Sequence, residues 1–187
     1  MPRSGAAARA RLREAALDLY AEQGYDVTTT AQIAARAGLT ERTYFRHFAD
    51  KREVLFDGEQ ELSDLMRGAI ASAPGDLTPL QLVLAAYRAA VPLFVAGRST
   101  AQRRLRIIET SSALQERAHA KVAMLSEALI GELRERDVPQ PIARLAVRAG
   151  AAVFERASSA WTGKSAADLE ALLAHGYDEL RALTSTD

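Results

Sequence analysis

Apolar residues recur at intervals of three and four along most of this 187-residue chain, and no segment keeps the strict alternation of a half-buried strand. In residues 5–23, for example, Leu12, Ala16 and Leu19 fall on one helical face. Apolar residues make up 48% of the sequence, which is enough to build a packed core. The sequence therefore predicts an all-α fold of about nine helices.

Three short helices are predicted within the first fifty residues. Gly24 ends the first, and Thr29 opens the second with Gln32 at the spacing of a capping box. Gly38 ends that second helix with the left-handed residue that a sharp turn needs, and Thr40 caps the third. Two helices joined this tightly form a helix-turn-helix, whose second helix enters the major groove of DNA by its N-terminal end.

The remaining helices form a larger body. Asp50, with Glu53 three residues later, predicts the start of a fourth helix directly after the third. Pro79 is well placed to open a fifth, which Pro92 is expected to kink or end early. The predicted boundary separates residues 1–52 from residues 53–187.

Charge is distributed unevenly although the formal net charge is zero. Residues 1–52 hold nine Lys or Arg and six acidic residues, which gives +3, so the remaining residues carry −3. A basic N-terminal part on an acidic body is compatible with DNA binding by the N-terminal part.

Several classes of protein are disfavoured by what the sequence lacks. Without cysteine there is no disulfide, iron–sulfur cluster or Cys-ligated zinc, and no two of the three histidines have metal-ligand spacing. We therefore expect no metal and no cofactor. No Ser–His–Asp set or glycine-rich phosphate loop indicates an enzyme. No uncharged apolar run of about 18 residues and no secretory leader appear, so we expect a cytoplasmic protein without a membrane span.

The segment around the predicted turn resembles the tetracycline-repressor (TetR) family of bacterial regulators, over about residues 8–56. The residues that carry the resemblance are Thr29, Ile33-Ala34, Ala37-Gly38-Leu39-Thr40, Phe45-Arg46-His47-Phe48 and Lys51. The resemblance implies a homodimer that pairs through its eighth and ninth helices and represses transcription from a palindromic operator. It also implies that residues 53–187 bind a small-molecule effector, which releases the DNA.

The leading ends of the second and third helices are predicted to contact DNA. Free N–H groups at Thr29 and Thr30 favour a phosphate, although capping alone also explains these threonines. Arg42 can pair with guanine, or serve as a phosphate contact or solvated charge. The full predicted set is Thr29, Thr30, Thr40, Glu41, Arg42, Thr43, Phe45, His47 and Lys51.

Three members of that set depend on the resemblance. Phe45 stands where the family often has a tyrosine; without the hydroxyl, its role is apolar packing on the DNA. His47 and Lys51 stand where the family contacts the phosphate backbone. Tyr44 and Phe48, by contrast, are expected to face inward.

Other features leave alternatives open. Arg9, Arg11 and Arg13 either follow a flanking phosphate or form a solvated face. An inward-facing arginine among residues 103–106 would indicate an anionic effector, and a solvated basic face is the alternative. The residues proposed to line an effector pocket, each of which also fits an ordinary core, are Tyr87, Phe94, Ile107, Met124, Phe154 and Trp161. Small residues at 150–152 suit a helix–helix dimer contact. Two further readings stay open: a body that binds a protein, and an activator of transcription.

Overall fold

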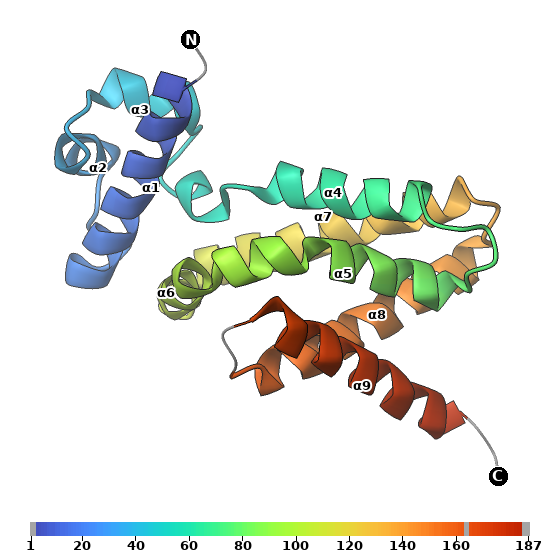
Figure 1. The fold of residues 1–187 in the computed structure, drawn as a ribbon. Helices are drawn as coiled ribbons and strands as arrows, with labels where there is room; N and C mark the ends of the chain where they lie inside the picture. The colour runs from blue at the N-terminus through green and yellow to red at the C-terminus, as the bar shows by residue number, and fades with distance from the viewer. Residues whose placement is uncertain (1–2, 163–164, 185–187) are drawn as a thin grey trace. The chain divides into compact units, whose positions relative to one another are not determined.

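The computed structural model describes residues 3–162 and 165–184, and this part of the chain is built of nine α-helices and one 3₁₀ turn, without strands (Figure 1). The predicted all-α fold is therefore confirmed. The elements in chain order are α1 (Arg3–Gln23), α2 (Thr30–Arg36), α3 (Glu41–His47), η1 (Glu53–Phe56), α4 (Glu59–Ala71), α5 (Pro79–Ala96), α6 (Arg98–Ile108), α7 (Ser112–Arg134), α8 (Gln140–Ala160) and α9 (Ala166–Thr184).

The helices group into two compact units. The first contains Met1–Glu59 and Arg98–Lys121, and the second contains Gln60–Gly97 and Val122–Asp187. Contacts thus assign η1, α6 and the first turns of α7 to the N-terminal unit. The boundary at residue 52, as a division between DNA binding and effector binding, stays a prediction.

The first unit has its own apolar core, to which α6 and α7 contribute. Tyr44 is fully buried and Phe48 nearly so, as expected, while Ile107 and Leu114 pack into the same cluster. The largest fully buried side chains here are those of Leu12, Leu17, Ile33, Tyr44, Val54 and Leu114. Burial of this kind stabilises the short helices α2 and α3, which are too short to be stable alone.

The turn between α2 and α3 depends on Gly38, whose φ is +64°. The N–H of Leu39 donates to the carbonyl of Ala34 at 2.8 Å, a hydrogen bond typical of a helix that ends in a left-handed residue. A Cβ on Gly38 would also lie 2.8 Å from Nη2 of Arg11. The glycine is therefore required by backbone conformation, whereas the flexible end of the Arg11 side chain could move away from a Cβ.

The fourth helix begins later than predicted. Asp50 does accept the backbone N–H groups of Arg52 and Glu53, at 2.7 and 3.0 Å, but it caps only the single turn η1. Gly58, with φ +89°, then interrupts the helix before α4 begins at Glu59. Asp50 thus binds the start of η1 and does not cap the fourth helix, and the continuous helix predicted after it is wrong because a left-handed residue cannot lie within an α-helix.

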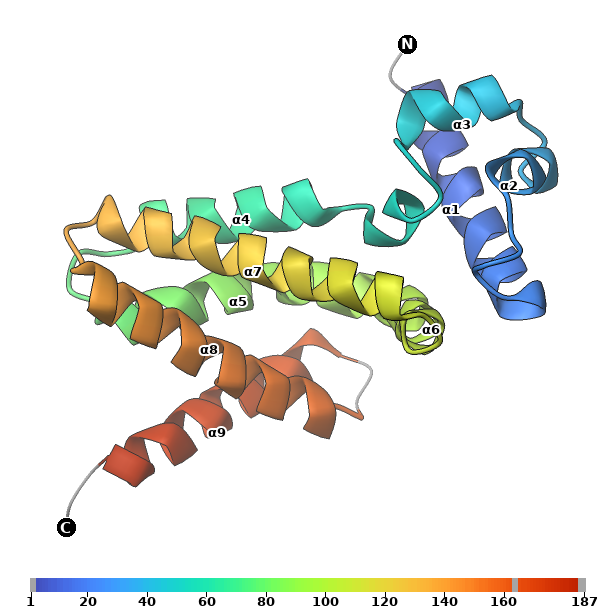
Figure 2. The ribbon, with the colours of Figure 1, turned by 180° about the vertical axis from the view of Figure 1, so that it is seen from behind.

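The second unit is organised around α5, which packs against α8 and α9 (Figures 1 and 2). Pro92 does not end α5 early, because the helix continues to Ala96. Pro92 is exposed, so the carbonyl that its missing N–H leaves unpaired can be hydrated. By length and composition alone α5 could cross a membrane, but it carries Arg88 and buries seven residues, as core helices of soluble proteins do.

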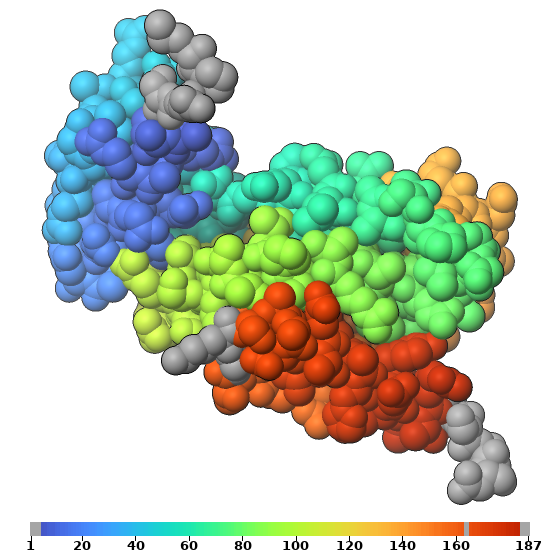
Figure 3. Space-filling view, viewed as in Figure 1, coloured from blue at the N-terminus to red at the C-terminus, as the bar shows by residue number. Residues whose placement is uncertain are grey.

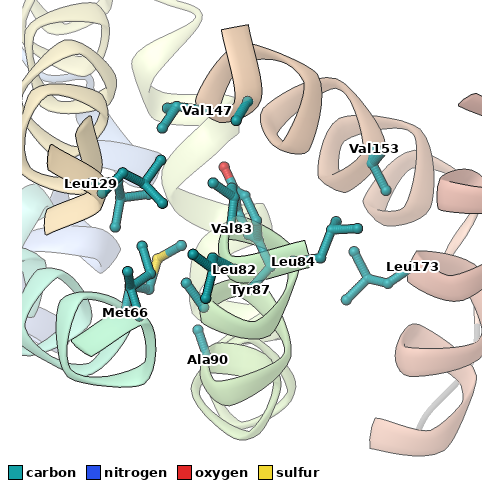
Figure 4. Close-up of a cluster of buried hydrophobic side chains, with 14 of the residues drawn as sticks. Met66, Leu82, Val83, Leu84, Tyr87, Ala90, Leu129, Val147, Val153 and Leu173 are labelled. Atoms are coloured by element: carbon teal, nitrogen blue, oxygen red, sulfur yellow. The ribbon is translucent and has the colours of Figure 1, made fainter. Parts of the chain in front are cut away.

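A close approach between α5 and α8 occurs at Gly150. A Cβ there would lie 2.4 Å from Cγ1 of Val83 and 3.7 Å from the ring of Tyr87. Val83 and Tyr87 face the helix that carries Val147 in the core of this unit (Figure 4). Gly150, which was predicted to allow close contact between protomers, therefore allows close contact between two helices of the same chain.

Candidate nucleic-acid interface

Thr40 caps the N-terminal end of α3. Its hydroxyl oxygen accepts the N–H of Thr43 at 3.2 Å and lies 3.0 Å from the Thr43 hydroxyl. Arg42, next to this cap, is exposed and makes no hydrogen bond or ion pair with any described residue. Its guanidinium is therefore available to a ligand on the outer side of α3.

Glu41 and Thr30 are bonded to each other, because the Thr30 hydroxyl donates to the Glu41 carboxylate. This bond joins the starts of α2 and α3, so it fixes the two helix ends relative to each other. Glu41 is thereby directed toward α2 and acts first as an organiser of the turn.

Thr29 forms the predicted capping box with Gln32. The Thr29 hydroxyl accepts the Gln32 N–H at 3.2 Å, and the Gln32 side chain accepts the Thr29 N–H at 2.9 Å. Both residues are exposed, so the remaining free N–H groups at the start of α2 face solvent and suit an anion.

Phe45 and His47 differ in exposure on the second half of α3. The Phe45 side chain is 53% exposed, with its ring edge-to-face against the buried Tyr44. His47 is half-buried, and its Nε2 has no hydrogen-bond partner among the described residues. Burial, with the nearby charges of Arg46 and Arg9, lowers the pKa of His47 from its ordinary value.

Lys51 is directed into the first unit. Its Nζ donates to the carbonyls of Tyr25, Asp26 and Thr28 at 2.9, 3.0 and 3.1 Å, and it lies 4.3 Å from the centre of the Tyr25 ring. An ammonium group has three N–H donors, and all three are used here. Lys51 therefore stabilises the connection between α1 and α2, a role that the sequence did not indicate.

Replacing Lys51 with methionine should lower the free energy of unfolding by about 1–2 kcal/mol, because three carbonyls lose a charged donor while the aliphatic stem is kept. Urea denaturation followed by circular dichroism would measure this. Arg46→Met, which removes an exposed cation from the same unit, is the matched control and should change stability by less than about 0.5 kcal/mol. Equal effects of the two variants would contradict the role assigned to Lys51.

Arg9, Arg11 and Arg13 of α1 each have partners, and the partners differ. Arg9 and Arg13 pair with Asp57, at 2.6 and 3.5 Å, and the guanidinium of Arg9 lies over the Phe48 ring. Arg11 donates to the carbonyls of Ala37 and Gly38 at the end of α2. A basic residue near a helix C-terminus is favourable to the helix dipole. These partners are far away in the sequence, which explains why the sequence could not decide between a phosphate contact and a solvated face for the three arginines.

The second unit brings four of the six proposed pocket residues into one core. The rings of Tyr87 and Phe154 stack at 4.7 Å, Phe94 lies 4.7 Å from Phe154, and Trp161 belongs to the same cluster. Burial raises the pKa of Tyr87 to about 12.

Ile107 and Met124 do not join this aromatic group. Ile107 is buried in the first unit, because α6 packs there, and Met124 is 67% exposed on α7. Their helical spacing could not reveal which face of each helix is covered. No cluster of His, Asp or Glu able to hold a metal is found within the described ranges.

Residues 12–57 match a sequence family described as bacterial regulatory proteins, tetR family. The chain is also 38% identical over 81 residues to the HTH-type transcriptional regulator TcmR of Streptomyces glaucescens. That match spans 43% of this chain and only 36% of TcmR, about a third of that protein's length. The family match thus lies within the first unit.

Solved structures extend the similarity to the whole fold. SmeT, the repressor of the Stenotrophomonas maltophilia multidrug efflux pump SmeDEF, aligns with a TM-score of 0.56 at 21% identity and covers 94% of this chain and 89% of SmeT. A transcriptional regulator of the TerR/AcrR family from Aquifex aeolicus VF5 gives 0.56 at 15% identity, over 94% of this chain and 99% of its own. At these identities the likeness concerns the fold alone.

Proposed function

Through its N-terminal domain the chain belongs to the tetR family of bacterial transcriptional regulators, and from this premise we propose that it is a ligand-responsive repressor. It binds a palindromic operator as a homodimer in the cytoplasm and is released by a small-molecule effector. The observation that carries the proposal is the exposed leading end of α3, where Arg42 has no partner among the described residues and Phe45 projects outward.

Contacts to DNA follow from the geometry of this surface. Arg42 reads a base edge in the major groove, and Thr40 and Thr43 lie beside it against the backbone. The open N-terminus of α2, at Thr29 and Thr30, receives a phosphate. Phe45 packs on the sugar–phosphate backbone or on a thymine methyl.

Dimerisation through α8 and α9 is supported by exposed apolar residues on both helices. Ile142 and Leu145 on α8 are 47% and 66% exposed, and Ala152 continues the same stripe. Ala167 and Ala171 are exposed on α9, which lies along the outside of the second unit (Figure 3). Two copies that pair these faces bury both stripes.

Effector binding is proposed for the aromatic core of the second unit. Tyr87, Phe94, Phe154 and Trp161 offer flat apolar surfaces, and the Tyr87 hydroxyl is a polar group without a hydrogen bond to described residues. Apolar walls with few polar groups are usual for small-molecule sites. The protein-partner reading keeps the same DNA interface and replaces only the effector.

Selection of bound duplexes from a random DNA library at two salt concentrations tests the proposal. We expect an enriched inverted repeat with half-sites about 34–36 Å apart, or a multiple of this, and affinity that falls as salt rises. Absence of enrichment at both salts would refute the operator. Expression of a reporter behind the selected operator then separates repression from activation.

Replacing Arg42 with alanine should relax the preference at one base pair of each half-site and weaken binding to the selected operator roughly tenfold, within the 1–3 kcal/mol of a bidentate contact. Stability should not change, because Arg42 makes no contact to the described residues. Arg36→Ala, which removes an arginine paired with Glu22, is the control for charge and should leave base preference intact. An unchanged preference in Arg42→Ala would assign the arginine to phosphate.

A further inference from the structure

Arg117 of α7 binds two glutamates of the first unit and offsets one of their two negative charges. Its guanidinium donates to Glu53 at 2.9 and 3.0 Å and to Glu59 at 3.1 and 2.7 Å, and it lies over the Phe56 ring. Four charge-assisted hydrogen bonds use both carboxylates in bidentate geometry. Each of the four carboxylate oxygens accepts one of these bonds.

Two further cations, Arg104 and Lys121, lie near Leu55 and Glu59. Lys121, whose side chain is only 20% exposed, approaches Glu59 no closer than 4.0 Å. Arg104, half-buried on α6, makes one hydrogen bond to the described residues, from Nη1 to the carbonyl of Leu55 at 3.3 Å. Neither side chain makes a hydrogen bond to a carboxylate of the described residues.

Electrostatics show that these cations are incompletely compensated. Burial lowers the pKa of Lys121 to about 8; the charges of Arg104 and Arg117 act in the same direction, and Glu59 opposes them. Burial also lowers the pKa of Arg104; the charge of Glu59 opposes this shift, and the smaller effect of Arg13 of α1 adds to it. The buried Nε of Arg13 is itself without a hydrogen-bond acceptor among the described residues. Arg104, Arg117 and Lys121 thus carry three positive charges against the two negative charges of Glu53 and Glu59.

We infer that Arg104 and Lys121 form a binding site for a small oxyanion, a carboxylate or a phosphate group, within the first unit. An oxyanion supplies the acceptors that the protein lacks here: the fork of Arg104 can bind two oxygens, and Lys121 donates to one of them. The site requires neither the DNA interface nor the aromatic core, so it stands independently of the proposed repressor function.

Isothermal titration calorimetry of the full chain with inorganic phosphate and, separately, with acetate at pH 7 and constant ionic strength tests the site. We expect saturable binding of one anion per chain by at least one probe, and the stronger probe identifies the headgroup. Arg104→Met and Lys121→Met should each weaken binding by about tenfold or more. Arg106→Met, which removes an exposed arginine two residues along α6, should leave it unchanged. No binding of either anion, or equal loss in Arg106→Met, would overturn the inference.

Acetate provides a second arm, because it does not titrate between pH 7 and 9 whereas Lys121 does. Lys121 is protonated below its pKa of about 8, so affinity should be highest at pH 7 and fall severalfold at pH 9. The groups that face Lys121 are Glu59 of α4, Arg104 of α6 and Arg117 of α7. In Lys121→Met the residual affinity should not change with pH. Arg104→Lys, which keeps the charge without the fork, covers the case in which Arg104→Met does not fold.

Discussion

Arg117→Met should lower the free energy of unfolding of the first unit by about 3 kcal/mol, because it leaves two carboxylates partly buried without their principal cation. Glu53 and Glu59 are only 30% and 24% exposed and take all four hydrogen bonds from Arg117. Lys121, 4.0 Å from Glu59, compensates a part of the loss. The methionine keeps apolar contact with Phe56, so the effect measures mainly the ionic contacts. Urea denaturation followed by helical circular dichroism gives the change.

The matched control is Arg106→Met. It makes the same chemical change at an exposed position of α6 that has no hydrogen bond or ion pair to the described residues, and it should shift stability by less than about 0.5 kcal/mol. Arg117→Lys should fall between the two, since one ammonium cannot bind two carboxylates in bidentate fashion. If Arg117→Met and Arg106→Met were equally stable, the four hydrogen bonds would contribute nothing net.

Gly150→Ala should destabilise the second unit by about 2–3 kcal/mol through overpacking. The new Cβ would lie 2.4 Å from Cγ1 and 3.2 Å from Cβ of Val83, which is fully buried on α5. A β-branched side chain has few rotamers to retreat to, so α5 and α8 must move apart. Thermal and urea denaturation measure the loss.

Two variants test that explanation. Gly131→Ala places a methyl in open space on α7 and should stabilise the protein by up to about 1 kcal/mol, as alanine does within a helix. Val83→Ala removes the atoms that Gly150→Ala meets, so the double variant should be less destabilised than the sum of the single variants. Strict additivity would show that the close approach is not the cause.

Short-range features of the fold could be predicted from the sequence. The capping box of Thr29 and Gln32, the left-handed Gly38 and the burial of Tyr44 all follow from residues within one or two turns of each other. Each of these features depends on residues that are close together in the sequence, so the sequence alone is enough to predict it. The exposure of Arg42 and Phe45 could be predicted in the same way, from their positions along one helix.

Long-range partners could not be predicted in the same way. Lys51 reaches carbonyls more than twenty residues earlier in the chain, and Arg117 reaches glutamates about sixty residues away. A lysine or arginine has the same local signature whether it faces solvent, DNA or a buried carbonyl. Ile107 shows the same limit for apolar residues, since its periodicity fits either unit.

The only tryptophan of the chain, Trp161, is 8% exposed in the core of the second unit, and the first unit has none. The protein therefore contains a natural optical label for one of its two units. Tryptophan fluorescence should follow the melting of Gly150→Ala, while loss of structure confined to the first unit in Arg117→Met should leave the emission unchanged. An aromatic compound that enters beside Tyr87 and Phe154 should quench or shift the same emission, so effector candidates can be screened without any added dye.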